Sequence, residues 1–314
     1  MKLSTLVSYH QHLEQFDSKL ALDVLHKHLA PILHSVTTHE LQFYDLTDQL
    51  ITDLTSVQDN IHAFEKTLTS VKRSIKHMIE TEEHAYFAQS YKLYDEEMRN
   101  DSTDLILNRR FELSDDSKDI VTGRIIKHSD WHYPGMIIRP GLEDWIDMLV
   151  ALDPLYLVDD SYELLDHSIN KFNQEYAQRL RKYVVNELNN EDQLLTALPD
   201  GQFGFVLAYN FFNFKPFEVV KQYLKETYSK LRPGGTFALT INDCDRPGGV
   251  KLAEQSFSCY TPKSLLVGLA TSFGYELAFS YEVNAAVTWL EFKKPGELSS
   301  LRGGQALAKI VAKD

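Results

Sequence analysis

The chain has 314 residues, 43% of them hydrophobic and 25% charged, which is the composition of a globular protein with enough apolar sequence for a core of normal size. Its formal net charge of −13 disfavours nucleic acid and anionic membranes as partners, because both bind to basic surfaces. The only cysteines are Cys244 and Cys259, so no disulfide framework is predicted. The sequence contains no signal peptide and no spanning run of about 20 apolar residues, so we expect a cytoplasmic protein. At about 150 residues per domain, we expect two domains.

Residues 1–100 are predicted to form an all-helical domain. They contain no glycine and a single proline, Pro31, and so few helix breakers favour helix throughout. We expect a first helix over residues 1–34. Asp17 and Ser18 are a plausible break and N-cap within it, and Pro31 should end or kink it.

One face of residues 43–78 carries an apolar heptad repeat. From Leu50 onward the spacing alternates between four and three residues without a slip, which is typical of a coiled coil. We therefore expect this repeat to mediate self-association. The alternative is that the long helix folds back on the first helix within one chain. The repeat consists of Phe43, Leu50, Leu54, Val57, Ile61, Phe64, Leu68, Val71, Ile75 and Met78.

Histidine is concentrated in the same helical region, where nine of the twelve histidines precede residue 85. The pairs His10/His12 and His26/His28 are two residues apart, and residues at that spacing point to different faces of a helix. These histidines are therefore predicted to lie on solvated helix faces, and no metal site is expected.

Residues 101–135 are predicted to be a junction, with one short helix over residues 117–126, and residues 136–294 an α/β domain. In that domain strands alternate with helices, which predicts a doubly wound, mainly parallel sheet with helices on both faces. The last two of the seven strands are separated by only five residues and should be antiparallel. Strands are expected over residues 136–138, 155–158, 184–185, 203–208, 236–241, 275–281 and 287–292. Longer helices are expected over residues 142–152, 162–183, 216–231 and 261–273. Residues 295–314 form a C-terminal tail.

Two carboxylates, Asp159 and Asp160, follow the apolar strand at residues 155–158, and a helical pattern begins after Ser161. In open α/β sheets, ligands bind outside the carboxyl ends of the strands. An acidic side chain there can accept both hydroxyl groups of a ribose. The alternative is that this turn does no more than cap the helix that follows.

Several strings in this domain resemble the class I, S-adenosylmethionine-dependent methyltransferases, whose fold is a seven-stranded doubly wound sheet ending in an antiparallel hairpin. The resemblance covers residues 136–294. It implies S-adenosylmethionine as the cofactor and a methyl acceptor that the sequence does not identify. The strings are residues 155–165, Leu-Pro-Asp-Gly-Gln-Phe-Gly-Phe-Val at residues 198–206, Leu-Arg-Pro-Gly-Gly-Thr-Phe at residues 231–237, and Cys-Tyr-Thr-Pro at residues 259–262 followed by Phe-Gly-Tyr-Glu at residues 273–276.

The resemblance also implies a set of cofactor-binding residues. Asp159, with Asp160 beside it, would hold the ribose, and Gly141 is what remains of the glycine-rich first loop. Asn186 stands near the position of an adenine contact, and Tyr209 and Asn210 follow the fourth strand. No catalytic residue is predicted, because methyl transfer depends on positioning more than on acid–base groups.

The chain departs from the family pattern at positions that matter for the cofactor. Arg139 and Glu143 stand in the first loop where small residues are expected, and Gly204 stands where the family usually has an acidic residue. The scaffold therefore matches the family better than the cofactor site does.

These observations leave two main hypotheses. The first is a methyltransferase oligomerised through its N-terminal coiled coil. The second is a methyltransferase-like structural or assembly protein, for example a component of a viral particle or another large complex, with the cofactor site empty or blocked by Arg139 or Glu143. A nicotinamide-dependent dehydrogenase is a weaker third, because the chain lacks the Gly-x-Gly-x-x-Gly turn.

Overall fold

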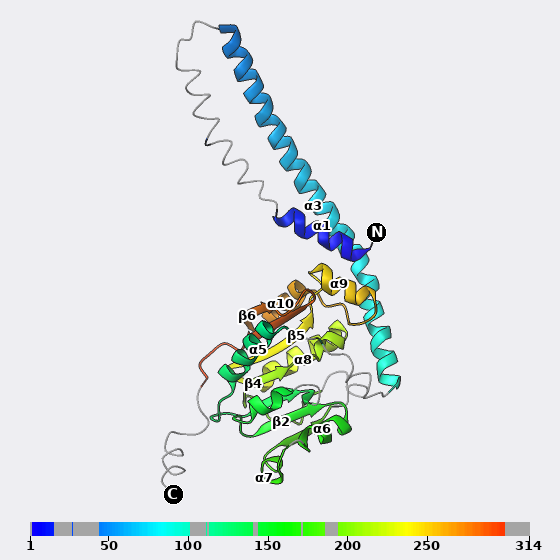
Figure 1. Cartoon of the computed structure of the whole chain (residues 1–314), viewed down its shortest axis with the longest axis vertical. Helices are drawn as coiled ribbons and strands as arrows, with labels where there is room; N and C mark the ends of the chain where they lie inside the picture. The colour runs from blue at the N-terminus through cyan, green and yellow to red at the C-terminus, as the bar shows by residue number, and fades with distance from the viewer. Residues whose placement is uncertain are drawn as a thin grey trace. The chain divides into compact units, whose positions relative to one another are not determined.

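The computed structural model describes residues 2–15, 27, 44–100, 111, 113–140, 144–170, 172–185 and 194–298 (Figure 1). The chain divides into two compact units, Met1–His84 and Ala85–Asp314. The described helices are α1 (Leu3–Gln15), α3 (Tyr44–Asn100), α5 (Asp115–His128), α6 (Tyr162–Ile169), α7 (Gln174–Ala177), α8 (Phe217–Lys230), α9 (Pro247–Glu254) and α10 (Lys263–Ser272), with 3₁₀ turns η2 (Asp144–Leu149) and η3 (Phe212–Phe214). The strands are β1 (Gly135–Ile138), β2 (Leu155–Asp159), β3 (Arg181–Val184), β4 (Phe203–Ala208), β5 (Leu231–Asn242), β6 (Glu276–Glu282) and β7 (Val287–Lys293).

The first unit contains α1 and the greater part of α3, an uninterrupted helix of 57 residues that begins at Tyr44. Lys72 Nζ lies 3.6 Å from Glu14 Oε1, so α1 is a neighbour of α3 at this point. None of the described helices combines the length and the apolar composition needed to cross a membrane. Phe43, Pro31, Asp17 and Ser18 lie outside the described residues, so the predicted break and kink stay predictions.

The heptad repeat of α3 has exposed members. Phe64, Val71 and Met78, all at d positions of the repeat, are 54%, 41% and 43% exposed. Large apolar side chains at this regular spacing on a helix surface form a stripe that another helix can cover. The predicted coiled coil remains a prediction.

The second unit is built on a seven-stranded sheet with the strand order β3-β2-β1-β4-β5-β7-β6. Strands β1 to β5 pair in parallel, and β7 is antiparallel to both β5 and β6. This is the predicted α/β sheet with a final antiparallel hairpin, and the fold prediction is confirmed in this respect.

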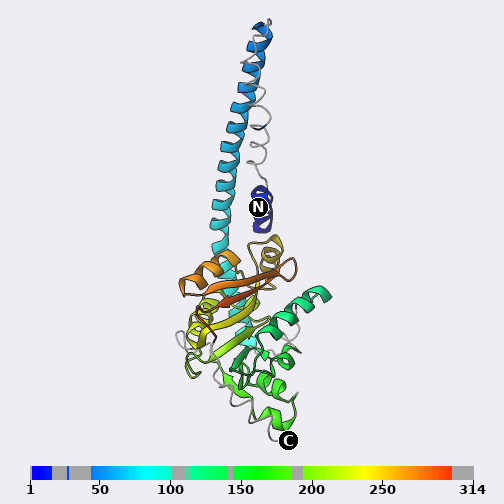
Figure 2. The same ribbon diagram turned by 90° about the vertical axis from the view of Figure 1, so that its left-hand side faces the viewer.

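Both faces of this sheet are covered, which is why its central strands are apolar along their whole length. Buried side chains of α8 and α10 pack on one face, together with Leu194, Leu195 and Leu198. Those of α5, η2 and α6 pack on the other face. Figure 2 shows α5 and α10 on opposite sides of the sheet.

Several predicted elements are wrong in extent. The helix expected over residues 162–183 ends at Ile169, because Asn173 starts a new short helix by accepting a hydrogen bond from Tyr176 N at 2.9 Å. The chain then enters β3 at Arg181, earlier than expected, where it pairs with β2. The described part of the helix expected over residues 142–152 is the 3₁₀ turn η2, and α9 was not predicted.

A buried ion-pair network joins α5 to the sheet. Glu291 on β7 is completely buried and accepts hydrogen bonds from Arg124 Nε at 2.7 Å, from Arg124 Nη2, and from Trp289 Nε1 at 3.0 Å. His128 Nε2 lies 3.1 Å from the same carboxylate. Burial alone would raise the pKa of Glu291, but these hydrogen bonds outweigh it and lower the pKa to about 2.

We expect Glu291→Gln to lower the free energy of unfolding by about 2–3 kcal/mol at neutral pH, because Arg124 would lose a charged partner. A lowered pKa stabilises the fold fully above the pKa of the unfolded carboxyl, about 4.3, and this stabilisation is lost as the pH falls through the folded value. The difference in the free energy of unfolding between wild type and Glu291→Gln should therefore shrink as the pH falls from about 5 to about 2. Urea unfolding across that range measures it.

The control is Glu218→Gln, which removes an exposed ion pair with Lys221 at 2.9 Å and should cost less than about 1 kcal/mol. A difference between wild type and Glu291→Gln that does not vary with pH would contradict the assignment.

Candidate functional site

The candidate site lies at the carboxyl ends of β1, β2 and β4, where the strand order of the sheet changes direction. Ligands of doubly wound sheets bind at this switch point. Three sequence segments meet there because their strands are neighbours: Arg139 follows β1, Asp159 and Asp160 end β2, and Tyr209 follows β4.

Arg139 projects into this site from the end of β1. Its backbone N–H donates to Val158 O at 2.7 Å, continuing the ladder between β1 and β2. Its side chain is only 3% exposed, and Nη2 donates to Asp160 Oδ1 at 2.7 Å and lies 3.5 Å from Asp159 Oδ1. The φ angle of Arg139 is +58°, a left-handed conformation that favours glycine.

A second buried cation completes the cluster. Lys215, in the turn that follows η3, donates from Nζ to Asp160 Oδ2 at 3.3 Å. The Phe211 ring lies beside both cations, with its centroid 4.9 Å from the guanidinium of Arg139 and 4.9 Å from Lys215 Nζ. Asp160 is thus held by two cations over an aromatic ring, and we call Arg139, Asp159, Asp160, Phe211 and Lys215 the switch-point cluster.

The two carboxyl groups of the cluster differ in their ionisation. Burial raises the pKa of Asp159, and the neighbouring Asp160 adds to the rise, which Arg139 only partly offsets. Burial alone would also raise the pKa of Asp160, but Lys215 and Arg139 outweigh it and hold that pKa well below its usual range. Asp160 is therefore the ionised partner of the two cations.

Asp159 takes part in the turn between β2 and α6. Its Oδ1 accepts a hydrogen bond from Ser161 N at 3.1 Å, and Ser161 Oγ caps α6 by accepting one from Leu164 N at 3.4 Å. The turn-forming alternative for this acidic pair is therefore realised. The second oxygen, Oδ2, is buried and accepts no hydrogen bond from any described residue. A ribose role for Asp159 stays a prediction.

Of the other four predicted cofactor residues, the structure describes two, Tyr209 and Asn210. Gly141 and Asn186 lie outside the described residues. The ring of Tyr209 packs in the core, with its centroid 5.3 Å from that of Trp145 and 6.5 Å from that of Trp289. Asn210 is completely buried with a φ of +53°, which asparagine tolerates, and its N–H donates to Thr240 Oγ1 at 2.8 Å.

The segment between α9 and α10 is held against the last turns of α3. Gln89 Nε2 donates to Ser256 Oγ at 2.6 Å, and Ser90 Oγ accepts from Tyr260 N at 2.8 Å. The Phe87 ring packs edge-on against Tyr260, with the centroids 5.0 Å apart.

Acidic residues after β5 have structural partners of their own. Asp243 accepts from Thr288 Oγ1 at 2.7 Å and from Asp245 N at 3.2 Å. Asp245 in turn accepts from Ser264 N at 2.6 Å and so caps α10. Cys244 is buried, and burial raises the pKa of its thiol. These contacts are those of turns and caps.

Two features of the described residues oppose the binding of S-adenosylmethionine. The carboxylate expected to receive the ribose faces the guanidinium of Arg139, and the first loop carries a long buried side chain where the family has close backbone approach. The sequence pointed to Arg139 as a departure. It did not indicate Lys215, although a lysine inside the aromatic stretch at residues 211–217 is an unusual place for a charge.

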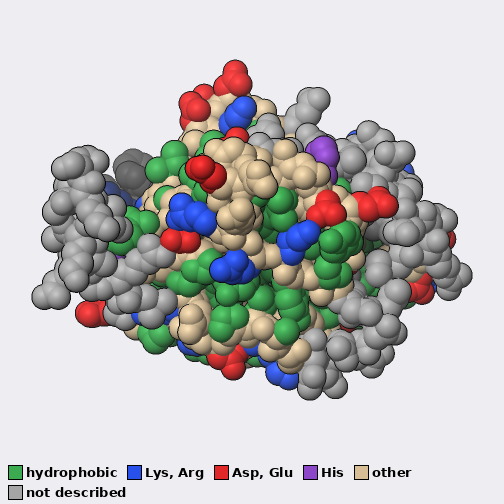
Figure 3. Space-filling model, turned by 90° about the horizontal axis from the view of Figure 1, so that it is seen from below, with side chains coloured by type: hydrophobic (Ala, Val, Ile, Leu, Met, Phe, Trp, Pro, Cys, Tyr) green, Lys and Arg blue, Asp and Glu red, His purple; other side chains and the backbone are tan. Residues whose placement is uncertain are grey.

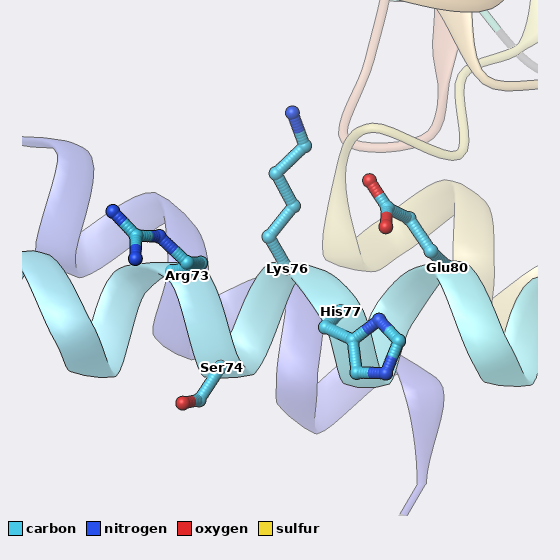
Figure 4. Close-up of a pocket in the computed structure, with 5 residues that line it drawn as sticks. All are labelled: Arg73, Ser74, Lys76, His77 and Glu80. Carbon is cyan, nitrogen blue, oxygen red and sulfur yellow. The ribbon is translucent and has the colours of Figure 1, made fainter.

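Figures 3 and 4 show two other parts of the surface. Figure 4 shows a shallow hollow on α3 lined by Arg73, Ser74, Lys76, His77 and Glu80, which are all exposed and leave the helix in several directions. Figure 3 shows one face of the molecule, on which basic side chains are interspersed with acidic and apolar ones. Within the described ranges, no group of three or more His, Cys, Asp or Glu residues is placed to hold a metal ion.

The topology defines the second unit as a methyltransferase-like α/β fold. No protein-family model and no curated protein matches the chain. Among solved structures, it is similar to a geranyl diphosphate C-methyltransferase from Streptomyces coelicolor A3(2), at 8% identity over 57% of this chain and 79% of that one, with a TM-score of 0.46.

Two further structures are similar. One is an S-adenosylmethionine-dependent methyltransferase from Mesorhizobium loti, at 8% identity over 57% of this chain and 98% of that one, with a TM-score of 0.45. The other is a SAM-dependent methyltransferase from Aquifex aeolicus, at 12% identity over 64% of this chain and 97% of that one, with a TM-score of 0.42.

We expect Asp160→Asn to lower the free energy of unfolding by about 3–5 kcal/mol at neutral pH, because Arg139 and Lys215 would be left as buried cations without their shared counter-charge. The matched control is Asp166→Asn, whose exposed pair with Lys182 at 2.7 Å should contribute less than about 1 kcal/mol. Urea unfolding of both variants measures the difference. Equal losses would show that the switch-point cluster is not a stabilising element.

Proposed function

We propose that this chain is an assembly protein in which α3 brings copies together and the methyltransferase-like unit serves as a folded block. The observation that carries the proposal is the exposed apolar stripe on α3, with Phe64, Val71 and Met78 each more than 40% exposed. A stripe of this kind on a long helix is covered most simply by a second copy of the same helix, because each copy supplies the same heptad spacing.

The stripe can contribute a large part of the free energy of association. Fully burying an apolar side chain of this size contributes about 1.5–3 kcal/mol, and partial burial contributes less. Even at about 1 kcal/mol for each side chain, two copies of the stripe exceed the roughly 8 kcal/mol that corresponds to micromolar affinity, before the entropy of association is subtracted. The described members of the stripe are Ile61, Phe64, Leu68, Val71, Ile75 and Met78.

The switch-point cluster supports a structural role for the second unit. Arg139 and Lys215 fill the space beside Asp159 and Asp160 with the protein's own cations, which corresponds to the structural hypothesis drawn from the sequence. Such a unit offers a stable surface for contacts in a larger particle or complex.

S-Adenosylmethionine-dependent methyl transfer to an unidentified acceptor is the second candidate function. It is favoured by Asp159, which ends β2 at the position expected for the ribose contact and keeps one buried oxygen that no described residue satisfies. A ribose hydroxyl could donate to that oxygen. Calorimetric titration of the chain with S-adenosylhomocysteine separates the candidates, since micromolar binding lost in Asp159→Ala would favour the enzyme.

We expect Val71→Glu to abolish self-association, because the substitution places a charge in the centre of the apolar stripe. Burying one unpaired carboxylate in a helix–helix contact should weaken the association by at least about 100-fold, or about 2.8 kcal/mol. Sedimentation equilibrium of the full chain measures this. The control is Ser70→Glu, one residue away but outside the stripe, which should behave as wild type. A wild-type chain that is monomeric at micromolar concentration would contradict the proposal.

A further inference from the structure

We propose that Arg139 is a built-in occupant of the cofactor position, and that this one side chain keeps adenosyl cofactors out of the switch-point cluster. The inference concerns the second unit and is independent of whether α3 self-associates.

The backbone of Arg139 has a conformation that is typical of glycine. Arg139 has the left-handed φ angle of +58° while its N–H still donates to Val158 O. Glycine adopts this conformation without steric cost, whereas other residues are strained in it. The loop after β1 thus keeps a glycine-type conformation at Arg139, where the family has small residues, but carries the longest basic side chain there.

The side chain of Arg139 points toward the two carboxyl groups and not into solvent. An arginine beside a surface loop normally extends into water, but the Arg139 side chain is 3% exposed and turns toward the ends of β2. Its guanidinium donates to Asp160 at 2.7 Å and lies 3.5 Å from Asp159. A ribose bound to the Asp159 carboxylate would lie beside this guanidinium, which faces Oδ1, so the guanidinium and the ribose compete for the space next to Asp159.

The charges of the switch-point cluster also hold Arg139 in place. Arg139 and Lys215 provide two positive charges beside the carboxyl groups of Asp159 and Asp160, and all four side chains are at most 15% exposed. Moving Arg139 into solvent would leave the buried carboxyl groups with Lys215 alone. A ligand can open the site only if its own interactions exceed this loss, so the closed arrangement is strongly favoured.

The test uses the full chain, its Arg139→Gly variant and the charge-matched double variant Arg139→Gly/Asp160→Asn, which removes one cation and one carboxylate together. Glycine suits the positive φ angle, and the double variant leaves the net charge of the cluster unchanged. The control is Arg179→Gly, which removes a half-exposed arginine paired with Asp153 at 2.9 Å. Each protein is titrated calorimetrically with S-adenosylhomocysteine, and its Tm is measured with and without that compound.

We expect wild type and Arg179→Gly to show no binding of S-adenosylhomocysteine up to millimolar concentration. Both variants with glycine at position 139 should bind it at least about tenfold more tightly than this limit, and their Tm should rise when it is added. Binding by wild type would overturn the proposal whatever the variants do. A folded variant, judged by wild-type circular dichroism, that fails to bind would also overturn it. Loss of self-association in Val71→Glu is a separate outcome and bears only on the proposed assembly role.

Discussion

The pairing of Asp160 with Arg139 and Lys215 is the constraint on which the switch point of the sheet depends. Arg139 follows β1, Asp160 follows β2 and Lys215 follows η3. The ion pairs therefore hold close together three segments that are far apart in the sequence. Buried charges cost several kcal/mol each unless they are paired with good geometry. The fold can therefore keep these charges inside only if the three connections hold their positions together.

The same principle applies on β7. Glu291 is fully buried in the sheet, and its partners Arg124 and His128 come from one face of α5. The apolar contacts of α5 with the sheet set the general position of the helix, whereas the carboxylate fixes its register. The second unit thus uses two buried ionic clusters, one at the carboxyl ends of the strands and one in the antiparallel hairpin, to specify contacts that hydrophobic packing alone leaves loose.

The sequence predicted the sheet well because its signals are local. An apolar run such as residues 203–208 marks a strand regardless of tertiary context. The proline and glycine residues at positions 233–235 were read as the turn before a strand over residues 236–241, but β5 already begins at Leu231. The helix expected over residues 162–183 was wrong because Asn173 and the pairing of β3 with β2 override the helical pattern, and cap and sheet contacts of this kind are decided by tertiary structure. At the site, Arg139 could be recognised as a departure from a glycine position. Lys215 could not be connected with Asp160, 55 residues away, because nothing in a single sequence reports which distant charges meet.

The opposite ionisation of Asp159 and Asp160 has a consequence for the proton balance of folding. Asp160 binds its proton less readily in the folded chain than in the unfolded chain, so folding releases that proton at pH values below about 3.9. Asp159 binds its proton more readily when folded, so folding takes up a proton at pH values above about 3.9, until the raised pKa is passed. The contribution of Asp160 to stability therefore grows as the pH rises to this value, and the contribution of Asp159 declines beyond it. Two adjacent carboxyl groups thus act as an opposed pair of proton-binding sites, one of which releases a proton on folding while the other takes one up.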